Sequence, residues 1–466
     1  MKETSDYRME RDTMGEVRVP ADRLWGAQTE RSRCNFRVGR RMPVEIIRAF
    51  AYLKQAAAEA NCALGVLPED KSALIVQVCG EIRDGLLDEE FPLVVSQTGS
   101  GTQTNMNVNE VIANRAAAIA GRRVLHPNDD VNKSQSSNDT FPTAMTVAAV
   151  TVLEDRLLPA LDAMSGTLRQ LEERYRGTVK TGRTHLMDAV PMTFGQEVSG
   201  WRSMMEHSKE YIEGTLPALR QIALGGTAVG TGLNAPDGFA AAVAEQLSAV
   251  TGKPFVSADN KFHALSAKDA FVYAHGALKA LAADLMKMAN DIRWLASGPR
   301  CGFGEIEIPA NEPGSSIMPG KVNPTQTESA CMVAVRVMGN DAAVGIAASQ
   351  GNFELNVYMP VIADAFLESA DLLAASLDSL NRNCVAGITA REDRMADYAE
   401  RSLMSAAALN PYIGYDKAAA CAKRAHADGT TLREAGVSLG YFTEEDYDTW
   451  IDLRALAGAG EDDCQR

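Results

Sequence analysis

The sequence contains little positive charge and no long uncharged apolar run. Its 46 Lys and Arg residues are outnumbered by 61 Asp and Glu residues, and the formal net charge is −15. Such an excess of negative charge argues against a nucleic-acid partner and favours a soluble, self-repelling surface. Because no stretch of about 18 uncharged apolar residues occurs, we expect no membrane partner.

Cysteine and histidine are sparse and scattered. The eight cysteines form no C-x-x-C pair and no His/Cys group at zinc-binding spacing, and there are only six histidines. The simplest interpretation is a set of reduced thiols in the cytosol. The first ten residues lack an apolar signal core and are too acidic for a typical mitochondrial transit peptide. We therefore expect a cytoplasmic protein.

Apolar material, in contrast, is ample. The chain has 466 residues, of which 46% are hydrophobic, so we expect two to three domains rather than one core. Loop-like segments lie near Asn138-Asp139 and near Ala390-Arg391. Boundaries placed there give an N-terminal domain 1–138, a central helical bundle domain 139–390 and a small C-terminal domain 391–466.

Apolar periodicity in the middle of the chain predicts long helices. Between Asp269 and Gly298, apolar residues recur in alternating steps of three and four, which is a heptad seam rather than a surface-helix stripe. We expect two more long helices, one over about 142–171 with a bend at Pro159 and one over about 324–337 and beyond. Narrow seams on several long helices indicate a mainly α bundle and favour an oligomer, because such seams often continue across subunit boundaries.

The most informative stretch is 314–324, Gly-Ser-Ser-Ile-Met-Pro-Gly-Lys-Val-Asn-Pro. Glycines let backbone N–H groups approach an anion closely, and prolines limit what a loop samples. The stretch therefore predicts a loop that holds two hydroxyls, a lysine and an amide in a defined relation. Two structural alternatives stay open: Ser315 as an ordinary turn serine, and Asn323 as the N-cap of a helix with Pro324 at its first position.

Three further blocks accompany this stretch, at 96–107, 126–139 and 182–186. Together the four blocks resemble the signatures of the fumarase/aspartase superfamily, and flanking stretches near both ends resemble its class II fumarases. The resemblance covers nearly the whole chain. It implies a mainly α, three-domain fold whose central long helices form one bundle in a homotetramer, with active sites built from three chains.

The resemblance also implies an activity, the reversible hydration of fumarate to (S)-malate through an aci-carboxylate, a step of the tricarboxylic acid cycle. Removal of a weakly acidic C–H proton requires a base and donors for the charge that develops, and the leaving oxygen requires an acid. Ser315 matches the family's base, His185 the residue that handles water, and Glu328 the acidic partner of that imidazole. Lys321 and Asn323 suit a substrate carboxylate, and Lys321 also suits an alkoxide on Ser315.

The same resemblance assigns residues to substrate binding, many of them just before predicted helices: Ser100, Gly101, Thr102, Ser136, Ser137, Asn138, Thr184, Ser316 and Val322. Free N–H groups at a helix start attract carboxylates, although helix capping alone explains either helix-start block. A second dicarboxylate site is expected at Arg123, His126, Pro127, Asn128 and Asp129. A metal site there is disfavoured because it lacks a second imidazole, and we expect neither a metal nor an organic cofactor.

Three alternatives remain at this point. Aspartase is the nearest rival: aspartases carry glutamine where this chain has His185, yet the 189–193 segment resembles aspartase, and Met187 replaces a glutamine usual in fumarases. A catalytically silent helical scaffold predicts loss of the acid–base set, which is present here. Finally, Glu328 also completes a capping-box pattern that starts at Thr325.

Overall fold

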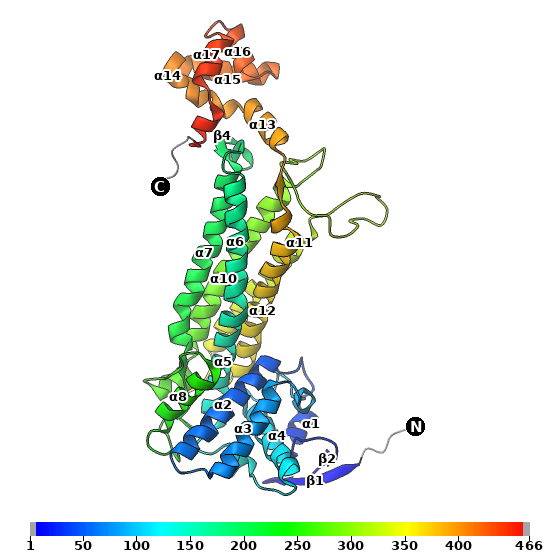
Figure 1. The fold of residues 1–466 in the computed structure, drawn as a ribbon, viewed down its shortest axis with the longest axis vertical. Helices are drawn as coiled ribbons and strands as arrows, with labels where there is room; N and C mark the ends of the chain where they lie inside the picture. Colours follow the sequence, from blue (N-terminus) through cyan, green and yellow to red (C-terminus); the bar gives the residue numbers. More distant parts are fainter. Residues whose placement is uncertain (1–5, 460–466) are drawn as a thin grey trace. The chain divides into compact units, whose positions relative to one another are not determined.

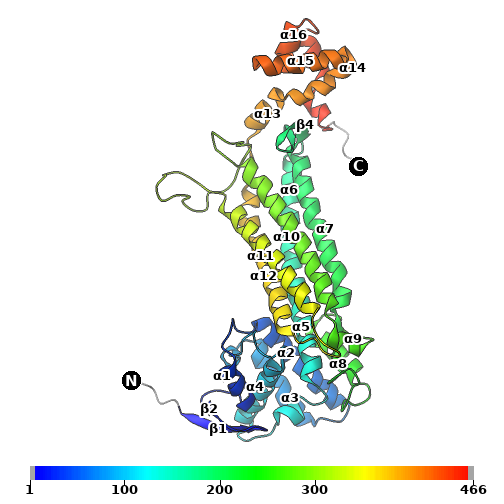
Figure 2. The same ribbon diagram turned by 180° about the vertical axis from the view of Figure 1, so that it is seen from behind.

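The computed structural model describes residues 6–459 and divides into two compact units. Unit 1 joins the chain up to Leu158 with Glu210–Ala280 and Val335–Leu373, and unit 2 joins Pro159–Lys209, Leu281–Ala334 and the chain from Ala374 onward. Helices dominate both units, as Figures 1 and 2 show. The predicted mainly α fold is therefore confirmed.

The α-helices are α1 Ala27–Asn35, α2 Val44–Ala63, α3 Glu69–Arg83, α4 Thr102–Ala120, α5 Ser137–Val152, α6 Leu158–Arg174, α7 Phe194–Leu219, α8 Phe239–Thr251, α9 Lys261–Ser266, α10 Asp269–Leu295, α11 Thr325–Ala348, α12 Met359–Asn383, α13 Glu392–Arg401, α14 Asn410–Ile413, α15 Tyr415–Asp428, α16 Leu432–Ser438, α17 Glu444–Trp450 and α18 Leu453–Leu456. Short 3₁₀ or π segments are η1 Asp88–Glu90, η2 Pro127–Val131, η3 Leu153–Leu157, η4 Val385–Gly387 and η5 Leu403–Leu409.

The strands are short and form four separate pairs within the described residues. Antiparallel pairs join β1 Tyr7–Asp12 to β2 Gly15–Pro20, β3 Val179–Thr184 to β4 Met187–Thr193, and β7 Ile306–Glu307 to β8 Thr389–Ala390, while β5 Gln221–Ile222 pairs in parallel with β6 Val256–Ser257. In β3–β4 the register runs from Val179 opposite Thr193 to Thr184 opposite Met187, with an irregularity after Thr181. None of these sheets forms a core layer, so helices carry the packing.

The long-helix predictions are confirmed with one correction. Helix α10 covers the predicted seam, and its seam residues are buried: Leu278, Leu281, Leu285, Met288, Ile292 and Leu295. Helix α11 begins at Thr325, as expected. The 142–171 helix instead starts earlier, at Ser137, and a π-helical segment, η3, replaces the bend expected at Pro159. Proline lacks an N–H, so the wider turn before it absorbs the missing hydrogen bond.

Polar contacts fix the helices within each unit. In unit 1, His275 on α10 contacts Asp341 on α11 (3.2 Å) and Ser369 on α12 (2.9 Å). In unit 2, the Trp201 indole on α7 donates to Asp291 on α10 (3.0 Å). The C-terminal helices pack around a cluster of their own: Leu409, Ala418, Cys421, Ala425, Leu432, Ala435, Phe442 and Ile451.

Helix α11 has two apolar faces. One face is buried: Ala330, Ala334, Val337 and Val344. The other is exposed and repeats in steps of four and three, which is heptad spacing; it begins with a charged residue, Glu328, and continues with Met332, Val335, Gly339, Ala342 and Ile346. By length and composition α11 is the one described helix apolar enough to cross a membrane, with 33% of its most apolar window buried. The exposed residues of this second face are called the α11 seam below.

Candidate active site

Unit 2 contains the predicted serine loop, which runs between β7 and α11 and extends away from the helices (Figures 1 and 2). The loop closes on itself: Gly314 N donates to Lys321 O (2.8 Å), and Asn323 Nδ2 donates to Gly314 O (2.7 Å). A Cβ at position 314 would lie 2.7 Å from Lys321 O, so the closure requires glycine there. The sequence prediction of a loop constrained by glycine is thus explained by a specific close approach.

Ser315 accepts two backbone hydrogen bonds within this loop. Ile317 N and Met318 N lie 3.3 and 3.1 Å from Ser315 Oγ. N–H groups directed at an oxygen favour its anionic form, which is what a serine base requires. No hydrogen bond or ion pair joins the Lys321 ammonium to Ser315 in the described chain. The N–H groups of Ile317 and Met318 are therefore the groups that contact Ser315 Oγ directly.

The two capping alternatives for this region do not occur. The Asn323 amide closes the loop instead of capping α11, whose first turn starts with Pro324 O accepting from Thr327 N and Glu328 N. No capping-box hydrogen bond joins Thr325 and Glu328 among the residues that the structure describes, and Glu328 is exposed at the start of the α11 seam. The Asn323 amide N–H is therefore used within the loop, whereas the Glu328 carboxylate makes no hydrogen bond in the described chain. Ser316, Lys321 and Val322 are exposed as well.

His185 lies at the tip of the β3–β4 hairpin of unit 2. The two-residue turn consists of His185 and Leu186, both with positive φ, 56° and 62°. Type I′ hairpin turns need positive φ at both positions and normally use Asn or Gly. Two side-chain-bearing residues held in this region indicate local strain of the kind found at functional sites. Thr184 and His185 are exposed, and within residues 6–459 of one chain no hydrogen bond joins His185 to Ser315 or Glu328.

A buried charge network supports this hairpin. Arg183, next to Thr184, makes two hydrogen bonds to the fully buried Glu305 (2.8 and 3.2 Å), and its guanidinium lies 4.5 Å from the Phe303 ring centroid. Lys180 pairs with Glu197 (2.6 Å) and approaches Glu305 (3.6 Å). Two cations and two anions therefore balance beneath the strand, which lowers the cost of burying them.

Unit 1 contains the Ser100–Thr102 block at the start of α4. Gly101 is the N-cap in the left-handed region (φ 73°) and has no side chain to cap the helix, but Gln97 Oε1 accepts from Thr104 N in the first turn (3.1 Å). A Cβ on Gly101 would lie 2.0 Å from the Phe141 ring. The hydroxyls of Ser100 and Thr102 are 2.8 Å apart. Neither hydroxyl caps the helix in the described chain, so the capping explanation fails for Ser100 and Thr102, and Gln97 has that role instead.

The Ser136–Asn138 block at the start of α5 is different. Ser136 caps the helix: it accepts from Asn138 N (3.2 Å), and Asp139 completes a capping box. The capping explanation therefore holds for Ser136. Ser137 Oγ accepts from Asn105 Nδ2 (3.0 Å), which ties this block to α4. Asn138 Nδ2 donates to Ala228 O (2.8 Å), and its amide oxygen accepts no hydrogen bond in the described chain.

The sequence analysis missed the segment that Asn138 contacts. Residues 225–232, Gly-Gly-Thr-Ala-Val-Gly-Thr-Gly, include four glycines, and positive φ occurs at Gly225, Thr227, Gly230 and Gly232. A Gly-rich run of this kind was the available signal. The segment is bound to α5 because Gly225 N and Thr227 N both donate to Asp139 Oδ2 (3.0 and 2.8 Å).

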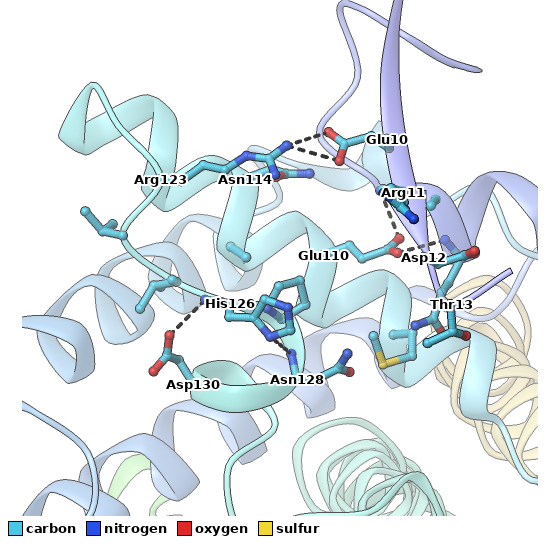
Figure 3. Close-up of a pocket in the computed structure, with 18 residues that line it drawn as sticks. Glu10, Arg11, Asp12, Thr13, Glu110, Asn114, Arg123, His126, Asn128 and Asp130 are labelled. Atoms are coloured by element: carbon cyan, nitrogen blue, oxygen red, sulfur yellow. Dashed lines mark hydrogen bonds and ion pairs between the residues drawn. The ribbon is translucent and has the colours of Figure 1, made fainter. Parts of the chain in front are cut away.

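Four of the five residues predicted for the second site line a separate cavity of unit 1, of about 680 Å³ (Figure 3): Arg123, His126, Pro127 and Asn128, whereas Asp129 does not line it. His126 accepts from Asn128 N (3.3 Å) and Asp129 N (3.1 Å) and so caps η2, which Pro127 begins. Arg123 is 76% exposed and pairs with Glu10 (3.2 Å). Four carboxylates line the cavity against two arginines: Glu10, Asp12, Glu110 and Asp130 against Arg11 and Arg123.

The described residues contain neither a disulfide nor a metal-binding cluster. Seven cysteines are free, and Cys464 lies outside the described residues. Across residues 6–459, no group of three or more His, Cys, Asp or Glu side chains is arranged to hold a metal ion.

Comparison with known proteins connects these geometries to a family. A family model described as "Lyase" matches residues 15–339, and one described as "Fumarase C C-terminus" matches 406–458. A relative named fumarate hydratase class II from Oceanobacillus iheyensis is 58% identical over 96% of this chain and 98% of its own length. One from Bacillus subtilis is 56% identical over the same shares. The crystal structure of a class II fumarase from Schistosoma mansoni superposes with a TM-score of 0.94 at 41% identity, covering 97% of this chain and 99% of that one. The chain therefore belongs to the lyase family and, within it, to the class II fumarate hydratases.

Proposed function

We propose that this protein catalyses the reversible hydration of fumarate to (S)-malate. The observation that carries the proposal is the self-closed loop in which two N–H groups are directed at Ser315 Oγ, in a chain 58% identical to a named fumarate hydratase. In the dehydration direction, Ser315 removes the proton from the carbon beside one malate carboxylate, and that carboxylate becomes the doubly charged aci-carboxylate. Hydrogen-bond donors directed at the carboxylate oxygens stabilise the negative charge that develops there and so lower the activation barrier for proton removal.

The other predicted residues have complementary roles in this proposal. His185 delivers a proton to the departing hydroxide, or takes one from water in the reverse direction, with Glu328 orienting the imidazole. Lys321 and Asn323 bind a carboxylate, together with Ser316, Thr184 and Val322. The start of α4, with Ser100, Gly101 and Thr102, and the Ser136–Asn138 block bind the remaining carboxylate oxygens.

The test is product identification. Purified protein is incubated with fumarate alone and with fumarate plus ammonia, and the products are identified by NMR. Malate formed without ammonia supports the proposal. Aspartate formed only with ammonia indicates the aspartase alternative, and no product in either case indicates a silent scaffold.

We also propose a homotetramer whose active sites combine residues from three chains. The support is the α11 seam: Met332, Val335 and Ile346 are 67%, 62% and 66% exposed at heptad spacing, and an exposed apolar seam of this kind favours helix association. Glu328 lies on the same face, so a catalytic residue would sit at the subunit contact.

Val335→Glu tests the assembly, because it places a charge in that contact. Light scattering should show a smaller particle, and hydratase activity should fall with it. Val38→Glu is the matched control, since Val38 is similarly exposed (66%) but lies outside the α11 seam. A monomeric wild-type protein with full activity would contradict the shared-site proposal.

We also propose three domains, a second dicarboxylate site and a cytoplasmic location. The separate core of the C-terminal helices, whose buried residues run from Leu409 to Ile451, supports the domain proposed at 391–466. The domains 1–138 and 139–390 stay predictions from the sequence. A dicarboxylate at the second site would have to displace Glu10 from Arg123. The negative net charge supports the absence of nucleic-acid partners, and the scattered cysteines support a cytoplasmic location.

A further inference from the structure

A buried ammonium lies beneath the segment that leads into α5. Lys54, on α2, is fully buried, and its Nζ donates to Asn132 Oδ1 (3.0 Å) and Gln135 Oε1 (2.9 Å). Both acceptors are neutral amides, and no ion pair within residues 6–459 includes Lys54. Burying a charge without an ion-pair partner costs free energy, so stability alone does not explain this lysine.

The amide oxygen of Asn132 connects Lys54 to the candidate site. Besides Lys54, it accepts from Asn105 Nδ2 (3.1 Å) and Asn109 Nδ2 (3.2 Å), both on α4. Asn105 Nδ2 also lies 3.0 Å from Ser137 Oγ. The ammonium therefore organises one end of the segment through a chain of side-chain hydrogen bonds that ends on a proposed substrate-binding hydroxyl.

A buried carboxylate holds the other end. Asp139 is 0% exposed and accepts from Ser136 N (2.9 Å) as well as from Gly225 N and Thr227 N. Burial lowers the pKa of Lys54 and raises the pKa of Asp139, and each charge favours the ionised form of the other. Opposite charges thus bracket the segment from Asn132 to Asn138.

We propose that Lys54 and Asp139 are positioning residues that hold the Ser136–Asn138 block ready to receive a substrate carboxylate. The inference rests on the proposed function of that block. A loop fixed before binding avoids the entropy cost of ordering when the ligand arrives, so removal of the clamp should weaken binding more than it slows the chemical step.

The main variant is Lys54→Met, which removes the charge and keeps an apolar chain of similar length. We expect the KM for fumarate to rise about 5- to 20-fold while kcat stays within about twofold, because uniform binding is lost. If the Lys54→Met protein does not fold, the same measurement is made on Lys54→Gln, which keeps a hydrogen-bond donor but carries no charge. An unchanged KM in a folded variant would overturn the proposal.

Lys268→Met is the matched control. Lys268 is also buried (4% exposed), but its Nζ donates to the carbonyls of Ala264, Leu265 and Ala267 at the end of α9. Its loss leaves three carbonyls without that donor, so the thermal midpoint should fall more than in Lys54→Met while KM stays within about twofold. If both variants raised KM equally, the effect would be one of general stability and the clamp would be excluded.

A double-mutant cycle tests whether Lys54 affects KM through the amide side chains that accept its hydrogen bonds. If Lys54 acts through its amide acceptors, Lys54→Met combined with Gln135→Leu should raise KM little beyond the larger single effect, because the two residues act as one unit. Multiplicative increases in KM would mean independent roles and would contradict the chain of contacts.

Hydrogen–deuterium exchange separates this inference from the proposed function. Amides of residues 133–139 should exchange faster in Lys54→Met than in wild type, and at the wild-type rate in Lys268→Met. If the wild-type protein does not hydrate fumarate yet this exchange pattern appears, the clamp stands and the assigned function fails. Unchanged exchange in Lys54→Met overturns the clamp whatever the activity.

Discussion

Two of the motif blocks are built in opposite ways. The serine loop of unit 2 is held by bonds among its own residues, between Gly314, Lys321 and Asn323, and most of it is exposed. The Asn132–Asn138 segment of unit 1 is held by buried side chains from other elements, chiefly Lys54 and Asn105. Both blocks contain proposed site residues, yet only the second is fixed by the surrounding core.

Because the two blocks are held differently, we expect substitutions in one to affect turnover and substitutions in the other to affect the free energy of unfolding. Changes in the serine loop remove few buried contacts, so they should affect turnover and leave the folded state intact. Changes around the start of α4 and α5 disturb a packed interior, so they should lower the free energy of unfolding. Variants of both regions test whether this separation is real.

Ser315→Ala should give the largest effect. Loss of the proposed base should lower kcat by at least about 10³-fold, which corresponds to about 4 kcal/mol of transition-state stabilisation. The thermal midpoint and the oligomeric mass should not change, because the side chain accepts only local turn bonds. Initial rates at saturating fumarate provide the measurement. Ser316→Ala is the comparison variant and should alter KM more than kcat; a Ser315→Ala rate within tenfold of wild type would rule Ser315 out as the base.

Gly101→Ala should have the next largest effect, now on stability. The new Cβ would lie 2.0 Å from the Phe141 ring at a residue with φ 73°, so we expect a loss of about 3 kcal/mol in urea denaturation. Gly121→Ala is the matched control at the other end of α4. Its φ is 69° but its Cβ would meet nothing within 4 Å, so only about 1 kcal/mol of backbone strain should appear. Equal losses in both variants would show that the packing against Phe141 is unimportant.

Gly314→Ala should have a smaller effect, and on turnover. The Cβ would lie 2.7 Å from Lys321 O and 2.8 Å from Asn323 N, so the loop must open by a fraction of an ångström. A displacement of this size costs about 10- to 100-fold in kcat when it moves a catalytic group. Urea denaturation should detect almost no change. A marked loss of stability would mean that the serine loop is fixed by the core after all.

The features that depend on local sequence pattern could be predicted from the sequence. The α10 seam follows from spacing, and the chemical groups of 314–324 are adjacent in the chain. Contacts between residues that are not neighbours in the chain could not be predicted from local pattern. Asn323 closes onto Gly314 rather than capping α11, and Asn138 contacts Ala228, 90 residues away. Lys54 lies in an Ala-rich helix, where a lysine is normally placed at the surface.

The smallest expected effect is a pH dependence that only the clamped segment should produce. Burial lowers the pKa of Lys54 to about 7 in the folded state, whereas an unfolded lysine titrates near about 10.4. Between these values the unfolded chain binds a proton that the folded chain lacks, so the free energy of unfolding rises with pH. Asp139 has the opposite sign: burial raises its pKa, so its contribution falls as pH rises from the unfolded carboxyl value toward the folded one. Urea denaturation at pH 7 and pH 9 should therefore show wild type gaining about 2 kcal/mol relative to Lys54→Met. Identical pH dependence in the two proteins would mean that Lys54 keeps its proton when buried, and the contrast with the serine loop would then rest on hydrogen bonding alone.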